Sequence, residues 1–556
     1  TPIYLTALIV YLLSVRSLFI DGLSSVGEFV LWPSFSEQVS SLFKGGLPAS
    51  EYPMVGSTFG RLIALVTTFS FGMNEGLAQT FFTVAMIPIG CYGVRLLLKE
   101  REVGTRSVAI GAVTYGMLSF GLQAFANGDF GAIVLLAGLP YFLRALANRK
   151  GRQAGFFGAV VVAFCPASIP VLAILGFFFL ITSDTRESGS KNNLKSKVQV
   201  LTITAAVISL LNVGIIFDLI RNLDRSAFGI SDTTSQFSEY LFSNLKLTIV
   251  LYLSLAIIVT ALIVVRKERS AELRLIALCL TFLFGVTAVA IHFAQPVFEV
   301  SVLYVMLQLC VAISIGVVFN AFDDELKLRS LGIFHLLSGV STTLILVSVL
   351  LGSSVLQEGR FGLANRSWAN QIEITKNERV LYLGDSRTIP GRSILAPLNR
   401  SFSVGDTSSV TFSRSFAGPA SPLDEQIRTI YSTMMASETS HAGYLLARLS
   451  IGVVAVPNSR APGTKELAID AQLLDALNRQ TDLVRLRDRQ GMAVFKNTAF
   501  ETGYSTDKYA QNLEPSVVLE NRFNDANSVE LSQARSFPST SLVTLAFILF
   551  GIFALL

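Results

Sequence analysis

Charged residues are scarce in this sequence. Only 15% of its 556 residues are Asp, Glu, Lys or Arg, whereas soluble globular domains carry about 25%. Hydrophobic residues make up 51% of the chain, and the mean hydropathy is +0.56. This composition excludes an ordinary water-soluble globule and predicts that most of the chain lies in lipid.

Cysteines and the usual binding motifs are also rare or missing. The chain has four cysteines, all inside apolar runs, so the sequence predicts no disulfide framework. The net charge is only +5, and the basic residues are spread over loops, which argues against nucleic acid as a partner. We find no Walker loop, no dinucleotide fingerprint, no Cys/His metal spacing and no internal repeat.

Long apolar blocks are abundant instead. They recur between short charged loops, and most have the length that a helix needs to cross about 30 Å of hydrocarbon. Apolar length predicts twelve spans, two of them short. They are residues 3–20, 77–98, 107–126, 130–148, 154–165, 168–183, 198–218, 247–265, 273–291, 300–320, 331–353 and 539–556.

The distribution of lysine and arginine predicts the orientation of these spans. Basic clusters fall in alternate loops, for example Arg95 to Arg106 and Arg144 to Arg152, and the loops between them are poor in positive charge. By the positive-inside rule this is a multi-pass plasma-membrane protein with a cytoplasmic N-terminus. A further apolar stretch, Phe59 to Met73, is too short for an easy crossing and carries Arg61. Counting it as a span would reverse every later loop, so we predict an interfacial helix 59–73 within a first outer loop, 21–76.

Polar composition returns after the eleventh span. Strand-like runs at 379–384, 451–456 and 492–496 are separated by helical patterns at 423–436 and 471–478. We therefore expect an all-α polytopic membrane protein of about twelve transmembrane helices with one extracytoplasmic α/β domain before the last helix. The predicted divisions are a membrane module at 1–356, the α/β domain at 357–538 and a final span at 539–556. The chain starts without Met and stops inside an apolar run, so we expect it to be a segment of a longer polypeptide.

Acidic residues at the predicted outer edge of the membrane are the main chemical signal. A carboxylate there can deprotonate an acceptor hydroxyl, and a second one can hold a divalent metal or a counter-ion of an incoming phosphate. The alternative for Asp21 and Asp129 is that they cap helices, because Asp is favoured at turns and helix starts. The acids at this level are Asp21, Glu28, Glu51, Asp129 and Glu299.

One outer loop carries more positive charge than its predicted position favours. Arg221, Arg225 and Lys246 lie there, and they can hold a lipid phosphate or diphosphate. The alternative is a solvated loop that contacts lipid headgroups. His292 lies beside the same surface, but one histidine without neighbouring ligands is not a metal site. Gly384-Asp385-Ser386 follows a strand and is best interpreted as a turn.

The arrangement resembles a known family. The first span ends in an acid, a long first outer loop holds an interfacial helix, and the third span leads to the acidic turn Phe125-Ala-Asn-Gly-Asp-Phe-Gly131. These features, with Ile87-Pro-Ile-Gly-Cys-Tyr-Gly-Val-Arg95, look like GT-C membrane glycosyltransferases. The similarity is greatest to large actinobacterial membrane proteins related to arabinofuranosyltransferases, in which such a module can follow a cytoplasmic GT-A glycosyltransferase domain.

The resemblance implies transfer of a sugar from a polyprenyl-phosphate donor to a cell-envelope glycan, with inversion, on the outer face. Carried over by position, Asp21 is the catalytic base, and Asp129 orients the substrate or a metal. Asp21 departs from the family pattern, since Gly22-Leu23-Ser24-Ser25 follows it rather than a second acid. The predicted substrate-binding residues are Glu28, Glu51, Arg61, Arg221, Arg225 and Glu299.

Two functional hypotheses therefore stay open. The first is a lipid-linked sugar transferase, with either a divalent metal (Mg²⁺ or Mn²⁺) or no cofactor. The second is a non-catalytic GT-C-like scaffold that binds or passes a lipid-linked glycan for a fused or partner glycosyltransferase. Under both hypotheses the partners are a polyprenyl-linked sugar, membrane lipid and a glycan acceptor. Span interiors nearly free of charge argue against an ion-coupled carrier.

Overall fold

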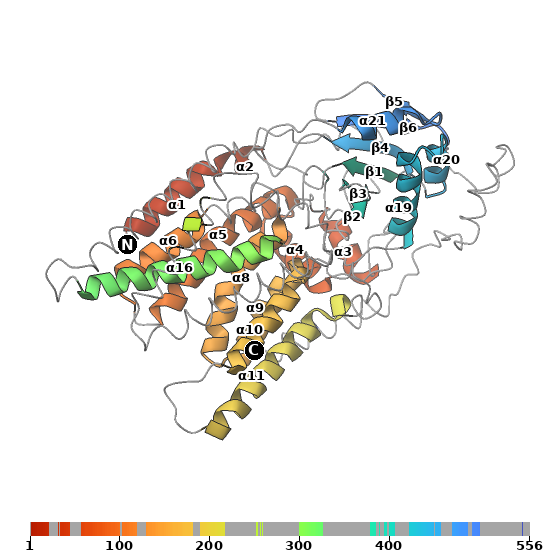
Figure 1. Cartoon of the computed structure of the whole chain (residues 1–556). Helices are drawn as coiled ribbons and strands as arrows, with labels where there is room; N and C mark the ends of the chain where they lie inside the picture. Colours follow the sequence, from red (N-terminus) through yellow and green to blue (C-terminus); the bar gives the residue numbers. More distant parts are fainter. Residues whose placement is uncertain are drawn as a thin grey trace.

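The computed structural model has a helical part and a part built on a β-sheet (Figure 1). We call them the helical part and the sheet part, and each has its own cluster of buried hydrophobic residues. The structure describes residues 2–21, 32, 34–44, 57–100, 103–118, 129–181, 190–216, 300–325, 379–384, 389, 394–396, 400–405, 422–449, 451–457, 470–486 and 492–500, with isolated positions between 249 and 258 and at 548.

The described helical part consists mainly of apolar helices. Four of its helices are long and apolar enough to cross a membrane, within the residues described: Glu75–Lys99, Phe130–Ala147, Leu194–Leu211 and Val302–Asn320. The chain is therefore a helical membrane protein. The elements are α1 (Pro2–Ser14), α2 (Arg16–Asp21), α3 (Phe35–Lys44), α4 (Thr58–Ser70), α5 (Glu75–Lys99), α6 (Thr105–Met117), α8 (Phe130–Ala147), α9 (Gly151–Phe164), the 3₁₀ turn η1 (Pro166–Ser168), α10 (Ile169–Ile181), α11 (Ser190–Leu211) and α16 (Val300–Glu325).

Two prolines inside long helices explain how neighbouring helices are tied together. A proline lacks the N–H that would bond to the carbonyl four residues earlier. In α5, Pro88 leaves the carbonyl of Val84 without that bond, and the Tyr11 hydroxyl of α1 donates to it at 2.9 Å.

The same solution recurs in α8. There Pro140 leaves the carbonyl of Leu136 without its helical donor, and the Tyr115 hydroxyl of α6 donates to it at 2.8 Å. A hydrogen-bond acceptor without a partner is costly in an apolar interior. These tyrosines therefore fix α1 on α5 and α6 on α8.

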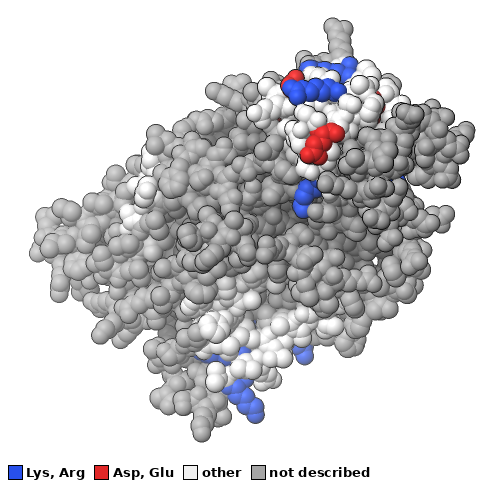
Figure 2. Space-filling model, turned by 45° about the vertical axis from the view of Figure 1, so that its right-hand side comes forward, with Lys and Arg blue, Asp and Glu red and all other residues white. Residues whose placement is uncertain are grey.

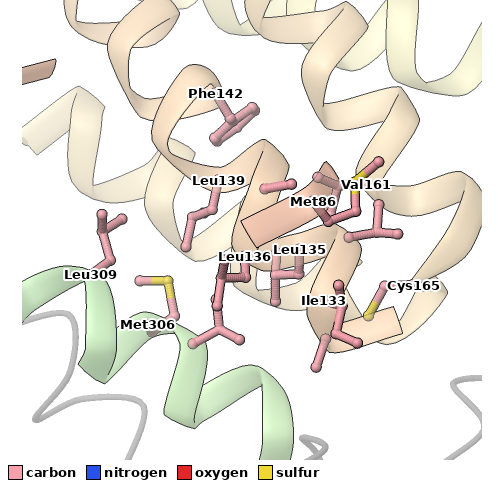
Figure 3. Packing of buried hydrophobic residues seen from close by; sticks show 14 of the residues in the cluster. Met86, Ile133, Leu135, Leu136, Leu139, Phe142, Val161, Cys165, Met306 and Leu309 are labelled. Atoms are coloured by element: carbon pink, nitrogen blue, oxygen red, sulfur yellow. The ribbon is translucent and has the colours of Figure 1, made fainter. Parts of the chain in front are cut away.

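The core of the helical part lies where α5, α8, α9 and α16 meet. Figure 3 shows Met86 of α5, Leu136 and Leu139 of α8, and Met306 and Leu309 of α16 directed into this region. Small residues allow the close approach. A Cβ atom added at Gly90 would lie 2.9 Å from the Leu136 carbonyl oxygen, so the backbones of α5 and α8 approach closely at this point.

Amide side chains of α16 hold both ends of α6. The Gln308 side-chain amide donates to the Tyr115 backbone carbonyl. The side-chain oxygen of Asn320 accepts from the Gly104 backbone N–H at 2.7 Å. These pairs join the end of α6 to the middle of α16 and the start of α6 to the end of α16. The two helices are therefore antiparallel, although about 200 residues separate them in the sequence.

Most predicted spans that fall on described residues correspond to helices. Spans 77–98, 130–148 and 300–320 match α5, α8 and α16 within a few residues, apart from a longer C-terminal end of α16. The short spans 154–165 and 168–183 are α9 and α10, separated by η1. The span expected at 3–20 is broken at Val15 into α1 and α2. Spans 273–291 and 331–353 lie outside the described residues, whereas Ile258 and Ile548, from two further predicted spans, belong to the helical core cluster.

The sheet part contains six strands in the order β2-β3-β1-β4-β6-β5. Strand β1 runs parallel to β4, and the other four pairings are antiparallel. The three strands expected from the sequence are β1, β4 and β6. The elements are β1 (Arg379–Gly384), β2 (Ile394–Ala396), β3 (Arg400–Gly405), α19 (Pro422–Met435), α20 (Ala442–Ala447), β4 (Ile451–Pro457), α21 (Ala471–Asn478), β5 (Leu483–Arg485) and β6 (Met492–Asn497).

One face of this sheet is covered by helices α19, α20 and α21. Leu381 pairs with Val404 on one side and Val454 on the other, so all three side chains point to the same face. They belong to one cluster with Ile427 of α19 and Leu473 of α21. The side chains on this face of the strands and the apolar stripes of the helices thus form a single core.

The described basic side chains on one face of the molecule lie at its two ends. Figure 2 shows lysines and arginines on the sheet part and at the tip of the helical part where α11 begins. Large apolar side chains are exposed on the helices instead, among them Leu5, Leu13 and Phe69. Exposed apolar side chains on the helices fit a surface that faces lipid.

Candidate functional site

The predicted first outer loop folds back onto one end of the helical part. Its described segments are Trp32, Ser34 to Lys44 and Ser57 onwards, and they form the helices α3 and α4. We call this the first-loop end, where α2 ends and both α5 and α8 begin. Figure 1 also places the sheet part at this end of the molecule.

Aromatic rings connect the segments that meet there. Phe19 of α2 and Phe71 after α4 both contact Phe81 of α5, with ring centroids 5.2 and 4.8 Å apart. Phe82, the next residue, contacts Phe130 of α8 at 5.9 Å. Phe19 lies two residues before Asp21, and Phe130 directly follows Asp129. The backbones of the two predicted catalytic acids therefore lie at the same end of α5, although more than 100 residues separate them.

Asp129 is the N-cap of α8. Its carboxylate accepts a hydrogen bond from the Ala132 backbone N–H at 2.9 Å, and the side chain is half-buried. The capping alternative from the sequence is therefore seen in the structure for Asp129. Asp21 is the last residue of α2, and its side chain lies outside the described part of the chain.

Helix α4 carries the predicted interfacial stretch, and one of its faces is buried. The buried face includes Arg61, Ala64 and Thr68, spaced by one helical turn. Only 3% of Arg61 is exposed. A guanidinium presents several N–H donors to phosphate and carboxylate groups, so Arg61 is a candidate for contacting an anionic group at this end.

Polar contacts fix the start of α4 near Arg61. Ser57 caps the helix by accepting from the Gly60 backbone N–H at 2.9 Å, and its hydroxyl lies 3.5 Å from the Asn212 side-chain oxygen. Asn212 in turn donates to the Ala159 carbonyl of α9 at 3.0 Å. The first turn of α4 is therefore anchored to α9 and to the end of α11.

Helix α3 was missed by the sequence reading. It packs antiparallel to α4, with the Gln38 amide donating to the Thr68 hydroxyl at 3.1 Å and the Phe35 and Phe69 rings 6.2 Å apart. The segment Phe35-Ser-Glu-Gln-Val-Ser-Ser-Leu-Phe-Lys44 has apolar residues at positions one, five, eight and nine. That spacing is typical of an amphipathic helix and was the available signal.

The remaining predicted site residues lie outside the described part of the chain. A metal site is not seen within that part, since no three His, Cys, Asp or Glu side chains come together there. The metal alternative therefore depends on carboxylates whose positions are not described, and we derive no step through a metal. The predicted site residues that lie outside the described part are Glu28, Glu51, Arg221, Arg225 and Glu299.

In the sheet part, polar side chains serve the fold. The Asn497 amide donates to the carbonyls of Gly443 and Ile451 at 2.7 and 2.8 Å, and the Asp482 carboxylate accepts from the Tyr444 backbone N–H. Burial raises the pKa of the Tyr382 hydroxyl well above its ordinary value, so this group stays neutral. These contacts hold α20 against β4 and β6 and form no catalytic arrangement in the described residues.

Comparison with known proteins identifies the fold. No protein-family model and no curated protein matches the sequence. The solved structure of an Arg-to-Ser mutant of the arabinofuranosyltransferase AftD from mycobacteria matches with a TM-score of 0.50 and 12% identity, over 90% of this chain and 41% of that chain. The present chain thus spans about two fifths of the length of that protein. Its fold is of the GT-C type, as the sequence resemblance predicted.

Two further membrane enzymes match with lower scores. ArnT from Cupriavidus metallidurans matches with a TM-score of 0.42 and 13% identity, over 89% of this chain and 97% of that chain. The oligosaccharyltransferase of Archaeoglobus fulgidus matches with a TM-score of 0.43 and 13% identity, over 81% of this chain and 67% of that chain.

Proposed function

We propose that this chain is the transferase module of a membrane glycosyltransferase that uses a polyprenyl-phosphate sugar. The sugar would pass to a hydroxyl group of a cell-envelope glycan on the outer face of the plasma membrane. The proposal includes about twelve transmembrane helices, a cytoplasmic N-terminus, a membrane module at 1–356, an extracytoplasmic domain at 357–538 and a final span at 539–556. An actinobacterial origin and a fused or partner cytoplasmic glycosyltransferase belong to the same proposal.

The gathering of separate chain segments at one end of a GT-C-type fold carries this proposal. Asp21 and Asp129 follow and precede phenylalanines that contact adjacent residues of α5, and α4 packs beside them with the buried Arg61. A transfer between a lipid phosphate and a sugar hydroxyl needs a base and a cation that stabilises the leaving phosphate. These three residues supply both kinds of group.

In the proposed reaction Asp21 removes the proton from the acceptor hydroxyl as its oxygen attacks the anomeric carbon of the donor. The bond from that carbon to the phosphate oxygen breaks, and the polyprenyl phosphate leaves with the electron pair. Arg61, with Arg225 or Arg221, stabilises the phosphate charge. Asp129 orients the acceptor, and Glu28, Glu51 and Glu299 supply further acceptor contacts. A divalent metal is an alternative to the arginines for the phosphate.

A non-catalytic glycan-binding module is the second candidate. One observation favours it, because the Asp129 carboxylate is engaged in capping α8. The module would hold a lipid-linked glycan at the first-loop end for a fused or partner transferase.

The test is a transfer assay with the chain in lipid nanodiscs. Radiolabelled polyprenyl-phosphate pentoses and hexoses are offered with cell-envelope glycan acceptors, with and without Mg²⁺ or Mn²⁺. We expect extended glycan from the parent chain. Asp21→Asn should lower the turnover rate at least about 100-fold, since general base catalysis contributes that much or more.

Asp129→Asn has a matched control elsewhere in the chain. Asp470 caps α21 in the sheet part with the same kind of bond, to the Gln472 backbone N–H. Asn caps helices about as well as Asp, so Asp129→Asn and the control Asp470→Asn should both fold. Only Asp129→Asn should lower turnover. If Asp21→Asn and Asp129→Asn turned over as fast as the parent, the catalytic roles of Asp21 and Asp129 would be rejected. Retained binding of the lipid-linked glycan without transfer would then identify the scaffold.

A further inference from the structure

A groove lined by α1, α5 and α6 runs along the second half of α5, whereas the first-loop end lies at the start of α5. Figure 1 shows these three helices. Its volume is about 240 Å³. Pockets for drug-sized ligands usually measure about 300–1,000 Å³. This groove is smaller, so it suits part of an acyl chain better than a sugar nucleotide. Its walls are mostly apolar and include Ala7, Leu8, Ile87, Pro88, Val113 and Met117.

The two ends of this groove differ in polarity. Arg95 lies at one end, with its guanidinium carbon 5.2 Å from the ring centroid of Tyr4 and 5.6 Å from that of Tyr92. The other end is closed by Tyr11, whose hydroxyl is already bonded to the Val84 carbonyl. From Arg95 to Ile87 the wall of α5 extends about 12 Å. A ligand that fits has one charged end and an apolar tail.

The charge at the mouth is positive and available. Within the described residues no carboxylate forms an ion pair with Arg95, whereas the nearby Arg144 pairs with Glu100 at 2.5 Å. Lys99 lies one turn further along α5 and is exposed. Basic residues between membrane helices near the cytoplasmic surface attract anionic lipid headgroups. The positive-inside pattern predicts that this end of α5 is cytoplasmic.

The groove also opens toward the lipid. Leu8, which lines it, and its neighbours Leu5 and Leu12 are exposed on α1, and half of Tyr92 is exposed. A lipid from the surrounding leaflet can therefore enter sideways. Its headgroup phosphate would stay level with Arg95, which can extend toward the interface while its stem lies along the apolar wall.

We propose that this groove binds one acyl chain of an anionic glycerophospholipid, with the headgroup phosphate held by Arg95. The site is separate from the proposed transfer site, since the groove lies along the second half of α5 and the first-loop contacts lie in its first third. A bound lipid would fill the space between α1 and the α5–α6 pair and hold α1 in place.

Native mass spectrometry of the detergent-purified chain tests this proposal. Dioleoyl phosphatidylglycerol and dioleoyl phosphatidylcholine are the probes, because they share the same chains and differ in net headgroup charge. The parent should retain phosphatidylglycerol more strongly. Arg95→Gln should weaken that retention about five-fold, the effect of one basic residue at a lipid surface. The control is Arg152→Gln, an exposed arginine in the first turn of α9 outside the groove, which should change little.

Filling the groove separates chain binding from charge. Ala7→Phe and Val113→Phe place a ring into the space from opposite walls, and each should reduce retention of both lipids. Their thermal unfolding midpoints, measured without added lipid, should stay near that of the parent, and a variant that unfolds early is replaced by the other. Equal phosphatidylglycerol retention in Arg95→Gln and Arg152→Gln would overturn the proposal. So would stronger retention of a polyprenyl phosphate than of phosphatidylglycerol, or a dimer that Ala7→Phe disrupts.

Discussion

The helical part and the sheet part satisfy their buried backbone groups by different means. In the helical part, hydroxyl groups of Tyr11 and Tyr115 bond to carbonyls that prolines have left without helical donors. In the sheet part, amide and carboxylate side chains such as Asn497 and Asp482 bond to backbone groups in the first turn of the short helix α20. A tyrosine brings its hydroxyl on a large apolar ring, which suits an interior surrounded by lipid.

The surfaces of the two parts differ in the same direction. Exposed large hydrophobic side chains are frequent on α1, α4 and α5 and rare in the described sheet part, where Val484 and Leu486 are the examples. The solvent explains the difference, because apolar side chains gain nothing from burial when the surroundings are lipid. Membrane helices are therefore held together by close packing and hydrogen bonds, and the sheet part by hydrophobic burial.

The largest expected effect tests whether the first-loop end and the sheet part lie on the same side of the membrane. Impermeant thiol labelling of intact cells should modify Ser36→Cys in α3 and Ser440→Cys before α20, both exposed positions. Thr105→Cys at the start of α6, also exposed, should stay unlabelled until the cells are opened, because positive-inside orientation places it in the cytoplasm. The parent chain, with its own cysteines, measures the background. If only Thr105→Cys were labelled in intact cells, the orientation in the membrane would be the reverse of the predicted one.

The next effect concerns the amide that holds α20 in the sheet part. Asn497→Ala removes donors to two buried carbonyls and an acceptor for the Ala499 backbone N–H. We expect a loss of about 3 kcal/mol in the free energy of unfolding, since each buried group left without a partner costs about 1–3 kcal/mol. Denaturant unfolding, monitored by proteolytic cleavage within the sheet part, measures this loss in the free energy of unfolding.

Its control is the exposed Asn478 at the end of α21. Asn478→Ala should change stability by less than about 0.5 kcal/mol. Similar values for both variants would mean that the side-chain amide of Asn497 does not hold the sheet part together.

The smallest effect concerns the tyrosine that serves Pro140 in the helical part. Tyr115→Phe leaves the Leu136 carbonyl without its donor and should lower the free energy of unfolding in detergent by about 1–3 kcal/mol. In a Pro140→Ala background the helix regains an N–H for that carbonyl, so Tyr115→Phe should cost less.

Tyr92→Phe is the control, because Tyr92 is half exposed and should change stability by less than about 0.5 kcal/mol. An unchanged cost of Tyr115→Phe in the alanine background would show that its hydroxyl acts in some other way.

Much of the fold could be predicted because the signals are local. The helices α5, α8 and α16 follow from apolar length, and α21 spans Ala471–Asn478 as its pattern predicted. Strand β4 is an apolar run, and β1 is hydrophobic from Val380 to Leu383. Strands β2, β3 and β5 were not predicted. Strands β2 and β5 have three residues each, and so short a run contains too little periodicity to be recognised. Strand β3 has six residues, of which only Phe402 and Val404 are hydrophobic.

The candidate site was predictable only in part. The sequence placed Asp21 and Asp129 at one membrane level through loop charge, and capping was an expected alternative for Asp129. The burial of Arg61 was not predictable, because an arginine in a short apolar stretch is equally compatible with an exposed face. Burial followed from α4 packing on α9 and α5, which residues distant in the sequence determine.

The sequence by itself determined that this chain enters a membrane and where its longest helices lie, because hydrophobic length is a property of contiguous residues. It also determined that a polar α/β region follows them. Only the tertiary structure decided which tyrosine serves which proline, how α3 and α4 cover the first-loop end, and that a groove with Arg95 at its mouth lies between α1, α5 and α6. Each of these depends on atoms that the chain brings together from distant positions, and no local pattern specifies such a meeting.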